Sequence, residues 1–107
     1  MSGFDDTSYT VRSTVATTDT LTNTDYVLLC SPTGGSQTIN LPAVASIQPG
    51  RVYQIKRDAT ATNTVTLDGA SSETINGATT RAVGAAGTAG GVTIVSDGTA
   101  WHVLTSY

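Results

Sequence analysis

The feature that most constrains the fold is the segment at residues 92–104, in which two apolar runs flank an Asp97-Gly98 pair. Asp-Gly between apolar runs is a strong short-range signal for a β-hairpin, because a type I′ turn needs positive φ at both central residues. The sequence therefore predicts a hairpin with Asp97 and Gly98 at its tip. The predicted pairs are Ser96 with Thr99, Val95 with Ala100, Ile94 with Trp101, Thr93 with His102, and Val92 with Val103.

This register sorts the side chains of the hairpin into two faces. A slip by one residue would set Trp101 against Val95 or Thr93 and mix the two faces. Trp101 is the single tryptophan of the chain, and we expect it to anchor the core. One predicted face carries Val92, Ile94, Trp101 and Val103, and the other carries Thr93, Val95, Ala100 and His102.

The rest of the chain is also typical of β-structure. Threonine is the most frequent residue, and β-branched residues favour extended backbone. Short alternating or apolar segments recur between turn-forming residues, and Asn76-Gly77 is a second candidate type I′ turn. We predict an all-β fold, a small antiparallel β-sandwich or a jelly roll or barrel of about eight short strands. Residues 38–41 and 66–69 look alike, but only as alternating strands do, so no internal repeat is predicted.

The chain is expected to be one β domain, residues 8–107, preceded by a flexible polar arm, residues 1–7. Charged residues make up 12% of the chain and the net charge is −3. This composition lacks the basic footprint of a nucleic-acid-binding protein and the polybasic patch of a membrane-binding one. The chain also has no secretory signal and no apolar stretch of membrane-spanning length, so synthesis in the cytoplasm is expected.

Residues for catalysis or cofactor binding are scarce. His102 is the single histidine, and a general base would need a nucleophile and an orienting acid beside it. Cys30 lies in an apolar run and is interpreted as a small buried hydrophobic residue, with a reactive thiol as the alternative. We therefore predict no catalytic residue, no bound cofactor and no metal site. A calcium site built from loop carboxylates, drawn from Asp68, Glu73 and Asp97, is a less favoured alternative.

One local positive cluster is formed by Arg51, Lys56 and Arg57, which bracket a predicted strand. The favoured interpretation is a capped strand end, and the alternative is contact with an acidic partner.

Several segments together resemble a module common in virion surface proteins of tailed bacteriophages, which occurs in head fibres, capsid decoration proteins and tail-fibre or receptor-binding segments. The resemblance covers residues 19–104 and is a pattern of strands and turns, with no catalytic signature. It implies a trimeric β-structured part of the particle exterior. The segments are TDYVLL at 24–29, QTINLPA at 37–43, GRVYQIK at 50–56, NTVTLDG at 63–69, ETING at 73–77 and VTIVSDGTAWHV at 92–103.

From this resemblance we expect a capsid decoration (cement or head-fibre) protein, made in the host bacterial cytoplasm and located on the capsid exterior of the virion. It would bind the major capsid protein as a homotrimer, stabilise the assembled shell, and have no enzymatic activity. The alternative is a receptor-binding or carbohydrate-binding module of a tail fibre, and glycan binding is expected only under that alternative. The predicted capsid-binding arm is Ser2, Gly3, Phe4, Asp5 and Asp6. The predicted subunit interface is Thr93, Val95, His102 and Tyr107.

Overall fold

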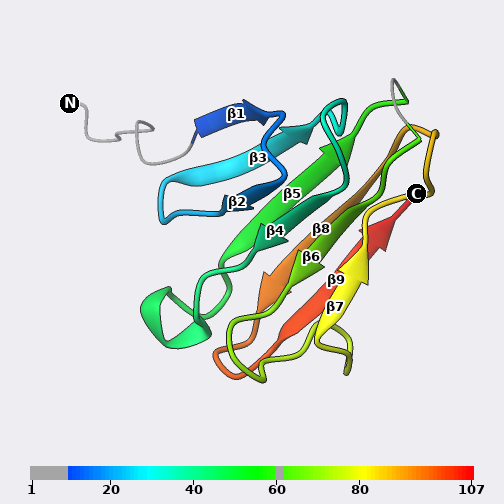
Figure 1. Cartoon of the computed structure of the whole chain (residues 1–107). Coiled ribbons are helices and arrows are strands. Elements are labelled where there is room, and N and C mark those ends of the chain that lie inside the picture. The colour runs from blue at the N-terminus through cyan, green and yellow to red at the C-terminus, as the bar shows by residue number, and fades with distance from the viewer. Residues whose placement is uncertain (1–9, 60–61) are drawn as a thin grey trace.

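Residues 10–59 and 62–107, which the computed structural model describes, form two β-sheets packed face to face (Figure 1). The five-stranded sheet has the order β1-β3-β5-β8-β9, and the four-stranded sheet has the order β2-β4-β6-β7. The predicted all-β sandwich is therefore confirmed. The strands are β1 Thr10–Thr14, β2 Thr18–Thr20, β3 Asp25–Cys30, β4 Gln37–Asn40, β5 Val52–Arg57, β6 Val65–Asp68, β7 Thr80–Ala82, β8 Gly90–Ser96 and β9 Trp101–Ser106. A short 3₁₀ turn, Val44–Ser46, precedes β5.

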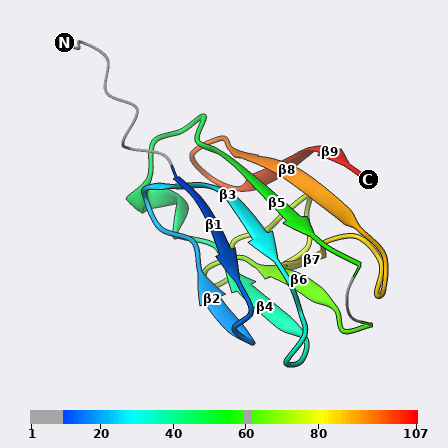
Figure 2. The same ribbon diagram turned by 90° about the horizontal axis from the view of Figure 1, so that it is seen from above.

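The first six strands alternate between the two sheets as the chain winds around the core. Figure 2 shows β1, β3 and β5 side by side in one layer and β2, β4 and β6 in the other. Each strand therefore returns parallel to the one before it in its own sheet, whereas β5–β8, β6–β7 and β8–β9 pair antiparallel. The sheets are therefore mixed, and the predicted antiparallel pairing holds for these last three pairs. Parallel neighbours need a crossover connection, and here a strand of the opposite sheet supplies it.

The winding stacks segments that the sequence did not identify as repeats. Residues 38–41 and 66–69 occupy equivalent places in successive turns, and Ile39 is paired with Leu67. Asp19 takes the same place in the turn before, next to Ile39. The repeat is structural, and it is weak in the sequence because Asp19 stands where the later turns have an aliphatic residue.

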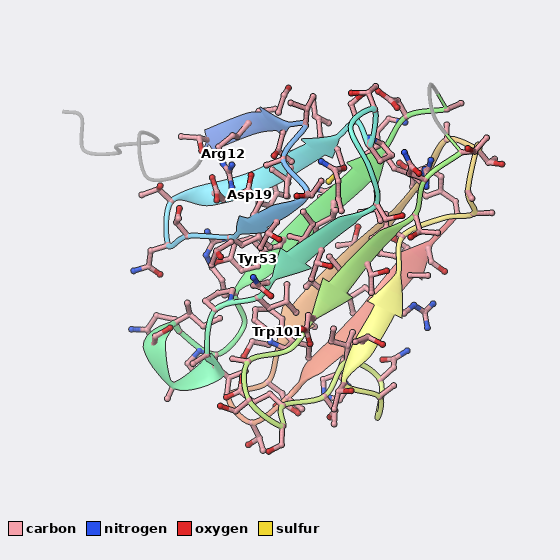
Figure 3. The ribbon with its side chains drawn as sticks, in the orientation of Figure 1. Arg12, Asp19, Tyr53 and Trp101 are labelled. Atoms are coloured by element: carbon pink, nitrogen blue, oxygen red, sulfur yellow. The ribbon has the colours of Figure 1, made fainter. Side chains whose placement is uncertain are left out.

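Trp101 anchors the core between the sheets, as predicted. Its side chain is fully buried, and its ring lies 5.7 Å from the ring of Tyr53 at an angle of 51° (Figure 3). This tilted contact is a favourable arrangement for aromatic pairs. The other buried apolar residues are Leu21, Leu28, Cys30, Ile39, Leu41, Val44, Ile55, Val65, Leu67, Ile75, Val83, Val92 and Ile94.

The Asn76-Gly77 turn has the predicted conformation. Both residues have positive φ, 52° for Asn76 and 86° for Gly77, as a type I′ turn requires. The flanking Ile75 and Ala78 exchange both of their backbone hydrogen bonds, at 2.6 and 3.1 Å.

The closing hairpin is formed by β8 and β9, but its register is shifted from the predicted one by two residues next to the loop and by three beyond an irregularity between Thr93 and Ile94. Trp101 faces Ser96 instead of Ile94. Because side chains alternate with a period of two, the shift by two leaves the predicted faces intact, and beyond it the unpaired Leu104 restores the alternation. The observed pairs are Ser96 with Trp101, Val95 with His102, Ile94 with Val103, Thr93 with Thr105 and Val92 with Ser106.

The shift arises because Asp97 closes a longer loop than a type I′ turn. Gly98 has a φ of 93°, but Asp97 is not among the described residues with positive φ. Instead, its carboxylate oxygen Oδ1 accepts hydrogen bonds from the amides of Thr99 and Ala100, both at 2.8 Å. Aspartate often stabilises turns in this way, and here it makes the connection four residues long.

Some sequence predictions concern residues outside the described ranges. The arm residues Ser2, Gly3, Phe4, Asp5 and Asp6 are among these, as are the first two residues of the predicted domain. Within the described ranges, the chain has no helix whose length and apolar character would allow it to cross a membrane.

Candidate functional site

The outward surface of the five-stranded sheet carries mainly apolar and small polar side chains. Val11 is 67% exposed, Leu104 57% and Tyr107 72%. Among the described strands of this sheet, Lys56 is the one outward residue with a permanent charge. We call this surface the apolar face. It consists of Val11, Ser13, Tyr26, Val27, Leu29, Val52, Gln54, Lys56, Gly91, Thr93, Val95, His102, Leu104, Thr105 and Tyr107.

A β-bulge in the pairing of β1 with β3 enlarges the apolar face. The register shifts by one residue after Asp25, which leaves Tyr26 as the extra residue. Both Tyr26 and Val27 then lie on the outward side, and the side-chain amide of Gln54 donates to the Tyr26 hydroxyl at 2.9 Å. Asp25 points inward and is 2% exposed.

All four residues of the predicted subunit interface lie on the apolar face. Val95 pairs with His102, and Thr93 precedes Val95 by two residues on the same side of β8. The hydroxyl of Tyr107 lies 2.9 Å from the place that a Cβ atom at Gly91 would occupy, so the tyrosine ring covers this glycine. The common location of these residues is what the predicted interface requires.

The outward surface of the four-stranded sheet has the opposite character. Its parallel register stacks three threonines in one row and sets hydroxyl, amide and carboxylate side chains in the next. We call this surface the polar face. It consists of Thr18, Thr20, Thr38, Asn40, Thr66, Asp68, Thr80 and Ala82.

Asp97 orients the imidazole of His102 at one end of the apolar face. The Nε2 and Oδ2 atoms are 2.7 Å apart, and both side chains are about half exposed, at 51% and 49%. The hydrogen bond from His102, followed by those from two backbone amides, lowers the pKa of Asp97 to about 2. Sequence reasoning missed this pair because the predicted register placed Asp97 at a tight turn. Among the described residues the imidazole hydrogen-bonds Asp97 alone, so no nucleophile accompanies this base.

Arg12 joins the first three strands through two carboxylates (Figure 3). Its Nη1 atom lies 2.8 Å from Asp19, and its Nε and Nη2 atoms lie 3.1 Å from the two oxygens of Asp25. This network lies on the inward side of β1 and closes the sandwich at that edge. Sequence reasoning missed it because the three residues lie on separate strands whose parallel stacking was not predicted.

The network shifts the pKa values of both carboxyl groups downward. The hydrogen bond from Arg12 is the main cause for Asp19. Burial alone would raise the pKa of Asp25, but the hydrogen bonds from Arg12 and from the amide of Thr22 outweigh it. Both groups are therefore charged in the folded protein, and the one guanidinium is shared between the two carboxylates.

The predicted positive cluster of Arg51, Lys56 and Arg57 does not form. Arg57 is fully buried and donates to the backbone carbonyl of Asn63 at 2.8 Å, whereas Lys56 points outward on the apolar face. The guanidinium of Arg51 lies over the ring of Tyr53, 4.1 Å from its centroid. These three cations thus have separate local environments, which favours the structural interpretation over a shared site for an acidic partner.

Cys30 is a buried core residue, as predicted. It is 2% exposed, and burial, with a smaller contribution from Asp19, raises the pKa of its thiol to about 12. The thiol therefore remains protonated and packs as a small apolar group. Across residues 10–59 and 62–107, no three His, Cys, Asp or Glu side chains gather in a way that could hold a metal ion.

Comparison of the chain with protein-family models finds no matching family, and comparison with curated proteins finds no matching protein. The functional assignment therefore depends on the residues of this chain. The feature of the described structure that bears on function is the apolar face.

Proposed function

We propose that this chain is a structural protein of a tailed-bacteriophage virion, which binds the outer surface of the assembled capsid as a homotrimer and stabilises it. The sequence resemblance supports the phage assignment. The observation that carries the proposal is the apolar face, a broad sheet surface with several exposed aliphatic side chains and one permanent charge. Soluble proteins rarely leave such a surface in water unless it binds something.

The trimer forms by burial of the apolar face between copies. A stable interface of ordinary size buries about 800 Å² on each partner. Apolar area contributes roughly 25 cal/mol for each Å² removed from water, before the costs of association are subtracted. Thr93, Val95, His102 and Tyr107 lie together on this face and are the proposed contact residues.

The trimer stabilises the shell by mass action. A protein that binds the assembled lattice but not free capsid subunits shifts the equilibrium toward the lattice. The proposed anchor to the major capsid protein is the arm, Ser2, Gly3, Phe4, Asp5 and Asp6, with the Phe4 ring as its apolar contact. Segments that become ordered on binding can cover a large surface. No catalytic role is proposed for any residue.

Removal of residues 1–7 tests the two parts of this proposal separately. The mass of the truncated protein, measured by sedimentation, is expected to remain that of a trimer, because the apolar face is intact. Its binding to capsids, measured by co-sedimentation and by electron microscopy of the particle, is expected to be lost. Normal decoration by the truncated protein would show that the arm is not the anchor, and a monomeric full-length chain would overturn the trimer.

The polar face favours a second candidate function, a receptor-binding or carbohydrate-binding module of a tail fibre. Its rows of hydroxyl, amide and carboxylate groups are of the kind that hydrogen-bond sugars. Binding of the isolated protein to a glycan array, together with antibody labelling at the phage tail, would favour this candidate. Labelling over the capsid with no glycan bound would favour decoration.

A further inference from the structure

A cleft of about 450 Å³ opens at the edge of the sandwich between β7 and β9. These are the last strands of the two sheets, so the cleft lies where both sheets end. Val92 and Ser106 line it from the five-stranded sheet, and Thr80, Arg81 and Ala82 line it from the four-stranded sheet. Tyr107, one of the proposed trimer contacts, also lines the cleft, but the backbone edges of β7 and β9 are not among the contacts proposed for the trimer or the arm.

Among residues 10–59 and 62–107, no backbone partner lies on the outer edge of β7. The carbonyl of Thr79 and the amide of Val83 bond to β6, and Arg81 pairs with Leu67 between them. By the alternation of an antiparallel ladder, the backbone groups of Thr80 and Ala82 point away from β6.

The edge of β9 is covered over half its length only. Trp101 donates its amide to the carbonyl of Thr74 at 2.8 Å and accepts a hydrogen bond from the amide of Asn76 at 3.0 Å. The side chain of Asn76 then accepts from the amide of Val103 at 2.9 Å. This short segment thus pairs with the edge as an added strand would. Beyond it, the alternation directs the backbone groups of Ser106 away from β8, on the side where Ser106 lines the cleft.

Arg81 lines this cleft with a half-buried side chain. In the described part of the chain it makes no hydrogen bond and no ion pair, whereas Arg12, Arg51 and Arg57 are all engaged. A guanidinium group binds a carboxylate through two parallel hydrogen bonds and does so most strongly away from bulk water. The complementary ligand is therefore an acidic side chain.

We propose that the cleft binds an extended acidic segment of the capsid shell protein, which adds as a strand to the open half of β9 and places a carboxylate on Arg81. Main-chain hydrogen bonds to Ser106 and Thr80 supply affinity, as in other cases of strand addition, and Arg81 supplies selectivity for acidic sequences. The contact is additional to the arm. It rests on the proposed function, which makes the shell the partner.

Hydrogen–deuterium exchange of the full-length protein, free and bound to capsids of its phage, tests this contact. The amides of Thr80, Ala82 and Ser106 are expected to exchange at least tenfold more slowly in the bound state, since they acquire hydrogen-bond partners. The amide of Thr18, on the far edge of the four-stranded sheet, is the internal control and should not change. Protection of Ser106 in the free trimer that disappears when residues 1–7 are removed would show that the occupant is the chain's own arm, and would overturn the proposal.

Three variants separate the charge from the backbone contact. Arg81→Gln is expected to weaken capsid binding about tenfold, and Arg81→Lys to retain part of the affinity because it keeps the charge. Ser106→Pro removes the outward amide from an edge strand that otherwise tolerates proline, and should also weaken binding. Sedimentation should give a trimer for all three. If capsids bind the unaltered protein and all three variants equally well, the cleft proposal is overturned while the proposed function stands; if the unaltered protein does not bind capsids, the proposed function itself fails.

Discussion

The two outward faces of this sandwich are built by the same winding of the chain and differ in what they expose. The apolar face presents Val11, Leu29, Leu104 and Tyr107 with at least a third of each residue exposed. The polar face presents threonines, an asparagine and an aspartate in stacked rows. Both faces lie on β-sheets that bury apolar residues on their inward sides, so burial in the core does not account for the difference.

The two faces differ in how well their side chains interact with water. Threonine satisfies the preference of a strand for β-branched residues and also hydrogen-bonds water, so the polar face can remain solvated in a chain of low charge. Valine on the opposite face gives a similar β-propensity but has no group that hydrogen-bonds water, and leucine also lacks such a group. Burial against another molecule would explain their presence there, and this is the basis of the proposed trimer.

The same charged substitution should weaken the trimer when it is placed on the apolar face and should have no effect on the polar face. Val27 lies inside a row of paired residues that crosses the five-stranded sheet. We expect Val27→Asp to raise the dissociation constant of the trimer more than 100-fold, or about 2.7 kcal/mol, because a carboxylate would be buried without a partner. Thr38→Asp on the polar face is the matched control and should leave the mass unchanged. Equal masses for both variants in sedimentation would show that the apolar face is not the contact surface.

Arg12 links the two sheets at the edge formed by β1 and β2, through its ion pairs with Asp19 and Asp25. We expect Arg12→Leu to lower the free energy of unfolding by about 3 kcal/mol, because Asp25 would remain buried without its partner. Urea unfolding followed by Trp101 fluorescence, at one fixed protein concentration, measures this loss. The double variant Arg12→Leu with Asp25→Asn should be less destabilised than the single one, since it removes both charges. A double variant as unstable as the sum of its parts would show that the ion pair contributes little.

The fold could be predicted from the sequence as far as local signals reach. The Asn76-Gly77 turn, the buried Trp101 and the two faces of the closing hairpin follow from dipeptides and alternation, and all are confirmed. Strand direction could not be predicted, because a strand of the opposite sheet replaces the helix that marks parallel connections in most proteins. The predicted hairpin register was wrong because the Asp97 side chain accepts hydrogen bonds from the loop amides, and these override the preference for a type I′ turn.

The candidate site could be predicted only in part. Placing Thr93, Val95 and His102 on one face needed only the hairpin alternation. The remainder of the apolar face depends on the order of the strands and on the bulge at Tyr26, neither of which has a clear sequence signal. Arg81 was not identified at all, since its distinction is the lack of a partner in the described structure.

Within the apolar face, His102 tests whether the end near Asp97 is part of the proposed contact. We expect His102→Asp to weaken the trimer about tenfold, or about 1.4 kcal/mol, because it sets a second carboxylate beside Asp97. His102→Gln keeps the size and a hydrogen-bond donor without the charge, and should assemble almost normally. Sedimentation over a range of concentrations gives both dissociation constants. Unchanged assembly of His102→Asp would count against this end of the face as a contact.

Acid should weaken the junction of the two sheets gradually. The pKa values of Asp19 and Asp25 are below their ordinary value of 3.8, so the unfolded chain takes up protons before the folded one. The stabilisation is therefore complete above about pH 4 and is lost as the pH falls through the lowered pKa values. As the pH is lowered from about 4, the urea midpoint should fall more steeply in the unaltered protein than in Arg12→Leu. Parallel curves would contradict the assigned role of Arg12.

The smallest effect is expected on the polar face, which the proposed trimer leaves in water. Thr66 lies in the middle of the polar face, paired with Thr38 on one side and Ala82 on the other. Thr66→Val keeps the shape and the β-propensity of the side chain and removes one solvated hydroxyl, so the free energy of unfolding should change by at most about 0.5 kcal/mol. The mass of the trimer should also stay the same. A variant that loses assembly or several kcal/mol of stability would show that the polar face is itself a contact surface, and the contrast between the two faces would then no longer locate the interface.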